Sequence, residues 1–365
     1  MSLVLLREGR AEFWAPDPAK YNDPARAPVF YNRYMARNRT ISTLVLSAFS
    51  ELKGGPLVVC EPLSATGIRG IRYALETKAV ERLILNDISS QAVDLIKKNL
   101  ELNGLSAEVY NEDANILLRR LGRQCDVVDL DPFGSPAPFM ESAFQAIRDG
   151  GMLCATATDT AVLVGNYKDK ALRRYGVRLF KTPFYVEVGL RALLGYIARV
   201  AAANDFAIEP LIAYWERHYF RVCVAVREGA REASDVLRRG LAYIVYLGGI
   251  RRVARRETAH SLGPLWVGPL GEPDLVARLP RPQEDRSAVE LLNTLTAEYT
   301  TVSPWYYLSQ EFGDLKMEVR ELIDLLLSNG VYATPTHMAP YGFKADAPYG
   351  ELYLILSRDI GRWQL

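Results

Sequence analysis

The sequence is poor in cysteine and carries almost no net charge. Its 365 residues include four cysteines, and 44 basic residues nearly balance 43 acidic ones, so the formal net charge is +1. No cysteine pair has CxxC spacing, and no histidine or second cysteine stands at ligand spacing from any of them, so we expect no metal site. Because all four lie within apolar runs, we expect buried, reduced thiols.

Long apolar runs and a signal peptide are also missing. No stretch reaches the roughly 18 uninterrupted apolar residues that a membrane-spanning helix needs. The N-terminal segment carries charges at Arg7, Glu8, Arg10 and Glu12, where a signal peptide would be apolar. We therefore expect a soluble, cytoplasmic protein that has no contact with a membrane and needs no obligate protein partner.

Two local runs of positive charge stand out against the balanced total. Residues 168–181 carry six basic groups against one acid, and residues 238–256 carry six arginines and no acid. The planar guanidinium of arginine suits phosphates and stacking on bases, which is typical of nucleic-acid binding. A solvated helical face is the alternative interpretation of either run.

Strand-like and helical patterns alternate from about residue 56. The strand-like runs are PLVVCE, RLILND, AEVYN, CDVVDLD and GGMLCATAT, and the helical patterns cover 67–76, 89–103, a short stretch from 114, and 136–148. This alternation predicts an α/β fold with a doubly wound, mostly parallel sheet. After a helix near 187–203, the runs AIEPLIAYW and HYFRVCVAVRE predict an antiparallel hairpin at one edge of the sheet.

The remainder of the chain has a different character. An arginine-rich linker and the turn-forming segment GPLWVGPLGEPD precede helical patterns at 286–299, 304–312 and 316–329, which the extended run VYATPTHM follows. Three helices and an extended segment resemble a winged helix, a module that docks nucleic acid or serves protein contacts and packing. At roughly 150 residues per domain, we expect two domains, 1–228 and a smaller α+β domain over 229–365.

Polar residues follow the first three strands of the predicted sheet, where an open α/β sheet binds its ligand. A loop of small residues, PLSATGIRG, follows the first strand. Asp87 follows the second, where a carboxylate accepts hydrogen bonds from both hydroxyls of a ribose. Asp113 and Ala114 follow the third and are placed for an adenine amino group. Capping of the next helix is the alternative role of both aspartates. Because GxGxxG and phosphate loops are missing, we expect a nucleoside without phosphates.

The fourth strand ends in Asp131, Pro132 and Phe133. An exocyclic amine of a base is a poor nucleophile, because its lone pair is delocalised, and acceptors that hold its N–H groups fix the line of attack. We expect Asp131 to orient such an amine and take its proton, and Phe133 to stack on the base. An Asp-Pro turn with a buried phenylalanine is the structural alternative. Asp129 is a weaker candidate, because it lies deeper in the strand.

Seven blocks resemble one known family, and the resemblance spans roughly residues 7–350. In chain order they read VFYNRYMARNR, EPLSATGIRG, LNDIS, DLDPFGSP, ATDTAVLVG, HYFRV and GPLWVGPL. Through them the chain resembles the tRNA guanine-26 N2-dimethyltransferase family. The resemblance implies a class I S-adenosylmethionine-dependent methyltransferase domain, which is Rossmann-like, and a C-terminal domain that helps to hold tRNA.

The resemblance also implies site residues. Those that match the family's contacts with S-adenosylmethionine are Arg39, Arg69, Asp87, Asp113 and Ala114. Those that match the surroundings of the target guanine are Phe30, Asp131 and Phe133. Arg39 and Arg69 would neutralise the carboxylate of the methionine part.

The chain departs from the family pattern in three places. The usual Asn-Pro is Asn32-Arg33, and the usual Asn-Arg-Asp ends in Thr40. Thr40 could cap a helix that starts at Ile41, but it cannot replace a carboxylate that orients Arg39. Many members carry four zinc-binding cysteines before GPLW, whereas this segment has none, so we expect no zinc.

The expected reaction is direct transfer of methyl groups, without a covalent intermediate, to N2 of guanine 26, giving N2-methyl- and then N2,N2-dimethylguanosine. The base must first turn out of the tRNA stack, which stacking on Phe30 and Phe133 would favour. The two basic runs would meet RNA phosphates. The alternatives are methylation of adenine N6, rRNA or a protein amide, and a catalytically silent RNA-binding protein.

Overall fold

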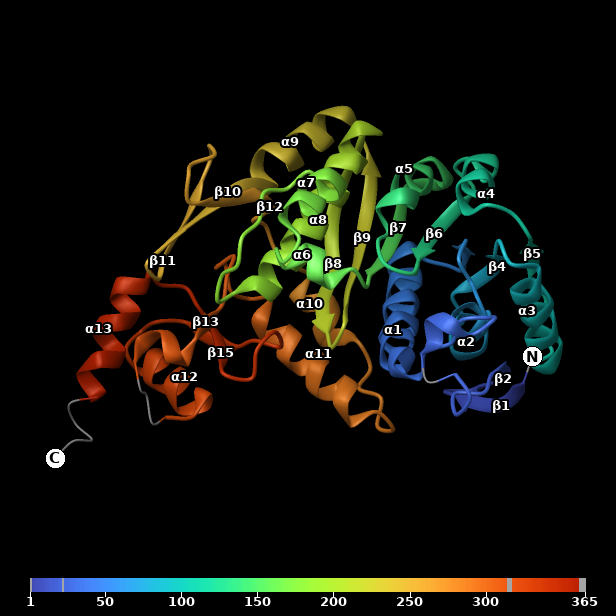
Figure 1. Cartoon of the computed structure of the whole chain (residues 1–365), viewed down its shortest axis with the longest axis horizontal. Coiled ribbons are helices and arrows are strands. Elements are labelled where there is room, and N and C mark those ends of the chain that lie inside the picture. The colour runs from blue at the N-terminus through green and yellow to red at the C-terminus, as the bar shows by residue number, and fades with distance from the viewer. Residues whose placement is uncertain (1, 22, 314–316, 361–365) are drawn as a thin grey trace. The chain divides into compact units, whose positions relative to one another are not determined.

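The computed structural model describes residues 2–21, 23–313 and 317–360, which form two compact units (Figure 1). The first unit comprises the described residues up to Thr156, together with Cys223–Glu228 and Leu279–Ala288. The second comprises the other described residues. The domain boundary expected after residue 228 stays a prediction.

A seven-stranded sheet has the strand order β5-β4-β3-β6-β7-β9-β8. Its strands are β3 (Leu57–Glu61), β4 (Val80–Asn86), β5 (Glu108–Tyr110), β6 (Cys125–Leu130), β7 (Ile147–Ala157), β8 (Phe206–Glu216) and β9 (Tyr219–Glu228). The neighbours from β5 to β7 are parallel. Two residues join β8 to β9, as in an antiparallel hairpin. The predicted α/β methyltransferase-like sheet with an edge hairpin is confirmed.

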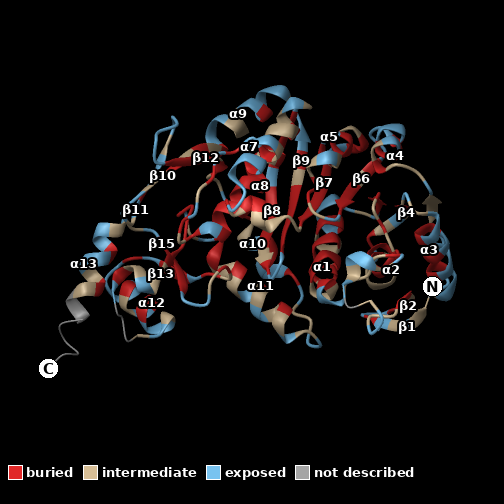
Figure 2. Ribbon diagram, viewed as in Figure 1, coloured by how far each residue is buried: buried red, intermediate tan, exposed pale blue. Residues whose placement is uncertain are grey.

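The order of the strands reverses between β3 and β6. The chain runs from β3 outward through β4 and β5, and then returns to β6 on the other side of β3. All five residues of β3 are buried, as are five of the six in β6, which explains why both strands read as apolar runs. Figure 2 shows β6 as largely buried. This reversal is the switch point at which an open α/β sheet binds its ligand.

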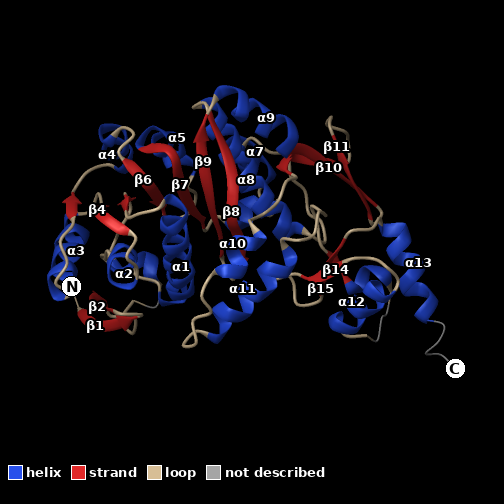
Figure 3. Cartoon of the chain, turned by 180° about the vertical axis from the view of Figure 1, so that it is seen from behind, coloured by secondary structure: helices blue, strands red, loops and turns tan. Residues whose placement is uncertain are grey.

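Among the described residues, five α-helices lie wholly within the first unit, and Figure 3 draws them in blue. They are α1 (Ala36–Lys53), α2 (Ile68–Glu76), α3 (Ser90–Leu102), α4 (Ala114–Leu121) and α5 (Ala137–Ala146). The Ser89 side chain caps α3 and the Asp113 side chain caps α4, so polar residues set where both helices begin. Helices predicted at 67–76, 89–103, from 114 and at 136–148 are confirmed.

An N-terminal hairpin of β1 (Leu3–Glu8) and β2 (Ala11–Pro16) precedes these elements and was not predicted. Two asparagines of α3 hold it in place. The Asn99 side chain accepts from the Trp14 backbone N–H at 2.7 Å, and Asn103 accepts from that of Glu12 at 3.1 Å. Two short 3-10 helices, Pro24–Arg26 and Arg33–Met35, lead from the hairpin to α1.

The remaining elements lie in the second unit, apart from residues 286–288, which belong to the first. Those before the C-terminal part are α6 (Thr160–Leu163), α7 (Lys168–Tyr175), α8 (Tyr185–Ala203), α9 (Ala230–Gly240), β10 (Leu241–Leu247), β11 (Ile250–Ala254), β12 (Ser261–Trp266) and α10 (Pro273–Arg278). Strands β11, β10 and β12 form an antiparallel sheet in that order. The expectation of a linker in this region is therefore wrong, because alternate residues of β10 are buried and the strand packs as part of a sheet.

The C-terminal elements agree with the expected winged-helix-like part, except in the segment 304–308. They are α11 (Arg286–Glu298), β13 (Tyr307–Leu308), the 3-10 helix η3 (Ser309–Phe312), α12 (Val319–Ser328), β14 (Ala333–Pro335), β15 (Gly342–Ala345) and α13 (Tyr349–Ile360). The helix predicted over 304–312 is wrong in its first part, because residues 307–308 form a strand and only the 3-10 helix over 309–312 follows. Tyr307 pairs with Phe343 of β15, and its buried ring stacks on the Phe343 ring, so this aromatic segment completes the sheet β13-β15-β14.

All four cysteines are buried, as expected, but two of them are not free thiols. Cys154 on β7 and Cys223 on β9 form a disulfide, with their Cα atoms 4.1 Å apart, whereas Cys60 and Cys125 are free. The expectation of reduced thiols is wrong for the first pair, because a separation of 69 residues does not reveal that the two strands are neighbours. Within the described ranges, no helix is both long and apolar enough to span a membrane.

Candidate active site

The loop after β3 forms one wall of the candidate site. Ala65 and Gly67 both have left-handed backbone conformations, with φ of 49° and 75°. For alanine this conformation is strained, and such strain is typical of functional loops. The Ala65 N–H donates to Asp87 Oδ2 at 2.9 Å, and the Gly67 N–H donates to the Ser64 carbonyl at 2.7 Å. The loop is therefore tightly curled and tied to the end of β4.

Arg69, on the first turn of α2, is the charged centre of the site. Its side chain is buried and forms an ion pair through Nη2 with Asp131 Oδ2. Its Nη1 donates to Asn38 Oδ1 at 2.9 Å and to Ser42 Oγ at 3.1 Å. Its Nε lies 3.5 Å from Glu61 Oε1. One guanidinium thus links α1 with the ends of β3 and β6.

Three carboxylates surround this single cation. Asp129 Oδ2 lies 3.8 Å from Arg69 Nη1 and accepts from the Tyr73 hydroxyl at 2.6 Å. Burial, against the opposing charge of Arg69 and together with the charges of Asp129 and Asp131, raises the pKa of Glu61 to about 8. Glu61 therefore holds a proton at neutral pH. Of the three acids, Asp131 has the most exposed side chain, at 21%.

Arg39, on α1, is held by a carboxylate from the N-terminal hairpin. Its Nε and Nη2 donate to the two carboxylate oxygens of Glu8, both at 2.6 Å, and Nη2 also donates to the Asn32 carbonyl at 3.1 Å. Helix α1 begins at Ala36, so Thr40 lies inside it, and the expectation that Thr40 caps the helix is wrong. The motif lacks an acid at position 40, but Arg39 is nevertheless paired with one.

Phe30 and Phe133 lie together, as the family pattern implies. Their ring centroids are 4.3 Å apart and the rings meet edge to face at 83°. Phe133 is 63% exposed, so the alternative of a turn with a buried phenylalanine is wrong. Phe30, Arg39, Arg69 and Asp131 line one small cavity, of which Phe30 forms an aromatic wall.

Asp87, Asp113 and Ala114 lie at the same end of the parallel sheet but outside the lining of this cavity. Asp87 accepts from the backbone N–H groups of Ser89 and Ala65. Asp113 Oδ1 accepts from the N–H groups of the second and third residues of α4, so the capping role considered for it is real. Its Oδ2 takes part in none of these bonds. Ala114 is buried at the first position of α4.

The donors and acceptors fit a nucleoside with an amino-acid tail. The buried Arg69 Nε and Asn38 Nδ2 have no hydrogen-bond partner in the described parts of the chain, and Arg39 Nη1 takes part in none of the bonds formed there. These donors suit a carboxylate, whereas Asp87 and Asp113 suit ribose hydroxyls and an amino group. No group of three or more metal-ligating side chains occurs among the residues that the structure describes.

Sequence reasoning undervalued three charged residues of the site. Glu61 and Asp129 interrupt the apolar strands LVVCE and CDVVDL, and this interruption is a signal, because a buried acid needs a partner. Glu8 gave no such signal, because it stands in a hairpin whose pairing with α1 depends on the tertiary fold.

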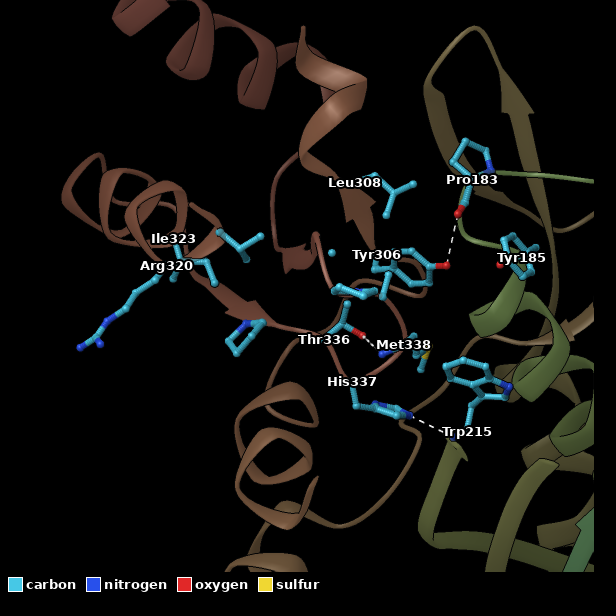
Figure 4. Close-up of a pocket in the computed structure, with 15 residues that line it drawn as sticks. Pro183, Tyr185, Trp215, Tyr306, Leu308, Arg320, Ile323, Thr336, His337 and Met338 are labelled. Atoms are coloured by element: carbon cyan, nitrogen blue, oxygen red, sulfur yellow. Dashed lines mark hydrogen bonds between the residues drawn. The ribbon is translucent and has the colours of Figure 1, made fainter. Parts of the chain in front are cut away.

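A second cavity, of about 840 Å³, lies within the second unit (Figure 4). Its wall includes aromatic and proline side chains, among them Tyr306, whose hydroxyl donates to the Pro183 carbonyl at 3.2 Å. His337 Nε2 accepts from the Trp215 backbone N–H at 3.0 Å, and His337 Nδ1 lies 2.5 Å from Glu298 Oε2. None of the predicted site residues lines this cavity.

Both basic runs lie in the second unit, and only part of each is available to a ligand. In the first run, Arg174 pairs with Asp159 at 2.8 Å and Arg178 with Glu257 at 2.9 Å. The exposed cations of this run that form no ion pair within the described residues are Lys168, Lys170, Arg173 and Lys181.

Arg251 shows that the second run is not wholly a surface feature. Its side chain is fully buried, pairs with Glu311 at 2.7 Å and lies 4.2 Å from the centroid of the Tyr307 ring. It therefore holds the aromatic core of the C-terminal elements and is not available to phosphates. Arg239, Arg252 and Arg256 are exposed.

Comparison with known proteins finds one family over almost the whole chain. Residues 9–357 match the family described as N2,N2-dimethylguanosine tRNA methyltransferase. The tRNA (guanine(26)-N(2))-dimethyltransferase of Pyrobaculum aerophilum is 56% identical to this chain, and the match covers 98% of this chain and 97% of the relative. The protein of the same name from Methanothermobacter thermautotrophicus is 34% identical, over 97% and 99%. A solved complex of Trm1 from Pyrococcus horikoshii with S-adenosyl-L-methionine has a TM-score of 0.86 and 34% identity, covering 97% of this chain and all of that one.

Proposed function

The chain belongs to the N2,N2-dimethylguanosine tRNA methyltransferase family, and on this premise we propose that it methylates N2 of guanine 26 in tRNA, first once and then twice. The observation that carries the proposal is the cavity at the switch point of the sheet, which Arg39, Arg69, Asp131 and Phe30 line together. The methyl donor is S-adenosyl-L-methionine, which the solved relative binds. A cytoplasmic location stays a prediction.

The donor-binding residues follow the ends of β3, β4 and β5, except Arg39, which lies on α1. Asp87 accepts from the ribose hydroxyls, and Asp113 with Ala114 receives the adenine amino group. Arg39 Nη1 and Arg69 Nε are the donors left for the methionine carboxylate. When bound, S-adenosyl-L-methionine supplies a methyl group made electrophilic by its positively charged sulfur.

Asp131 orients the nucleophile. Its Oδ2 is held by Arg69, whereas Oδ1 takes part in none of the bonds formed by the described residues. Oδ1 accepts a hydrogen bond from the guanine amine, which directs the nitrogen lone pair along the line of attack. As the new N–C bond forms, the bond between the methyl carbon and the donor sulfur breaks and leaves a neutral thioether. The nitrogen loses one proton, which passes to Asp131 and then to water. The second methylation repeats the step on the remaining N–H.

The target base meets an aromatic pair at the cavity. Phe133 is largely exposed and lies edge to face with Phe30, so a turned-out purine gains a stacking partner at the mouth of the cavity. The exposed cations of the two basic runs, among them Lys168, Arg173 and Arg239, contact tRNA phosphates. Recognition therefore rests on the shape and charge of the tRNA.

Nucleoside mass spectrometry on an unmodified tRNA transcript incubated with the protein and S-adenosyl-L-methionine tests this function. We expect N2-methylguanosine to appear first and N2,N2-dimethylguanosine later, and neither to form on a matched transcript with adenine at position 26. Methylation of adenine N6, rRNA or a protein amide instead would refute the substrate assignment. Donor-independent RNA binding without methylation would favour a catalytically silent protein.

A further inference from the structure

Glu8 is a buried carboxylate at the end of β1 that reaches the cofactor side of the site. It is 8% exposed. Its two oxygens accept from Nε and Nη2 of Arg39, and Oε1 also accepts from Arg72 Nη1 at 2.9 Å. The Tyr31 hydroxyl donates to Oε2 at 3.3 Å. A residue of the N-terminal hairpin thus contacts both α1 and α2.

The contact with Arg39 fixes the direction of its guanidinium. Two parallel hydrogen bonds to one carboxylate leave the planar group no rotation, and a third bond ties Nη2 to the Asn32 carbonyl. The Arg39 guanidinium also lies 5.5 Å from the centroid of the Tyr31 ring. Nη1 takes no part in these bonds, and Arg39, Tyr31 and Asn32 line the cavity that also holds Asp131.

Charge balance supports an ionised Glu8. Burial raises the pKa of its carboxyl, but the nearby charges and hydrogen bonds of Arg39 and Arg72 outweigh burial and leave this pKa below its usual value. Arg72 has a further partner, because its Nε and Nη2 donate to Glu76 at 2.7 and 2.8 Å. Its Nη2 also donates to Thr40 Oγ1 at 3.0 Å, so position 40 faces Arg72.

We propose that Glu8 is a positioning residue for the methyl donor: it holds Arg39 so that Nη1 meets the methionine carboxylate. This inference rests on the proposed function. Glu8 supplies the orienting carboxylate that Thr40 does not, from a segment more than thirty residues earlier in the chain. Its effect is confined to the amino-acid part of the donor, because the adenosine part binds at the ends of β4 and β5.

Two probes that differ only in the amino-acid part test this role. S-adenosylhomocysteine carries the carboxylate, whereas 5′-methylthioadenosine lacks it and keeps the adenosine thioether. Calorimetry should show that Glu8→Gln raises the Kd of S-adenosylhomocysteine roughly tenfold or more and changes the Kd of methylthioadenosine by less than about twofold. Arg39→Ala should give the same pattern, and the double variant should lose little more than either single one.

Glu76→Gln is the matched control, because Glu76 pairs with Arg72 without touching Arg39. It should leave both Kd values unchanged. If Glu8→Gln weakened the binding of both probes equally, the role of Glu8 would be merely structural. If it weakened the binding of neither, Arg39 would be positioned without Glu8. Either result overturns the inference. If Glu8→Gln does not fold, Glu8→Asp keeps the charge and shortens the reach, and the same selective loss is expected.

The outcome is separable from that of the proposed function. A wild-type chain that binds S-adenosylhomocysteine more tightly than methylthioadenosine, but methylates no tRNA, would contradict the proposed function and leave the role of Glu8 standing. A wild-type chain that binds the two probes equally would overturn the inference, because Arg39 would then make no use of the carboxylate.

Discussion

Asparagine in place of Asp131 removes one negative charge from the site and keeps the size of the side chain. Arg69 would retain its hydrogen bonds to Asn38 and Ser42, and Glu61 would still lie 3.5 Å from its Nε. The fold should therefore survive with a loss of about 1.5–3 kcal/mol, the usual value of a hydrogen bond to a charged group. The rate of methyl transfer should fall by more than this loss of stability suggests, because the acceptor that aligns the amine is weakened and can no longer take its proton.

The loss of one preorganised catalytic group costs about 10²–10³ in rate, or about 2.7–4 kcal/mol. Single-turnover methylation, with enzyme in excess over tRNA and saturating donor, measures this step directly. The Kd of S-adenosylhomocysteine should stay close to that of the wild type. Asp126→Asn, at the other end of β6, is the control and should transfer normally. A folded Asp131→Asn variant with transfer within roughly tenfold of wild type would refute the assigned role.

Four further outcomes follow from the structure. Asp87→Ala should raise the Kd of S-adenosylhomocysteine, measured by calorimetry, because the ribose loses its acceptor. The pKa of Glu61 is raised to about 8, so the stability of the fold should fall as the pH rises from about 4.5 to about 8. The urea midpoint of unfolding should therefore depend less on pH in Glu61→Gln than in the wild type over this range. The pKa of Glu298 is lowered to about 2, so its contribution to stability is present above about pH 4.5 and is lost as the pH falls towards 2. Urea unfolding should show that Glu298→Gln lowers the free energy of unfolding by about 1–3 kcal/mol at neutral pH and by less in acid. Under denaturing, non-reducing conditions, mass spectrometry should find Cys154 and Cys223 protected from alkylation until they are reduced.

The central sheet could be predicted from the sequence because its signal is local and repeated. Buried parallel strands read as continuous apolar runs, and polar residues mark their carboxyl ends. Asp87 and Asp131 could therefore be placed at one edge of the sheet before any contact was known. The same logic failed over 304–312, where a run of aromatic residues fits either a helix or a buried strand; pairing of Tyr307 with Phe343 decides it.

Contacts between distant segments could not be predicted in this way. The disulfide joins residues 69 positions apart, and Glu8 meets Arg39 only because the N-terminal hairpin packs beside α1 and α2. The departure at Thr40 predicted an arginine without an orienting carboxylate. The structure supplies that carboxylate from β1, so the absence of a motif residue does not establish the absence of its chemical role.

Arg69 and Asp131 received separate roles in the sequence interpretation, one in donor binding and one in catalysis. In the structure they form an ion pair, and Arg69 also lies beside Glu61 and Asp129. A change at Arg69 would therefore release the catalytic carboxylate from its fixed position and leave two buried acids near each other without their shared cation. Donor affinity, transfer rate and stability would all fall together. Substitution of Arg69 consequently cannot separate binding from catalysis in this site, whereas Arg39 and Asp131, which share no bond, can be varied independently.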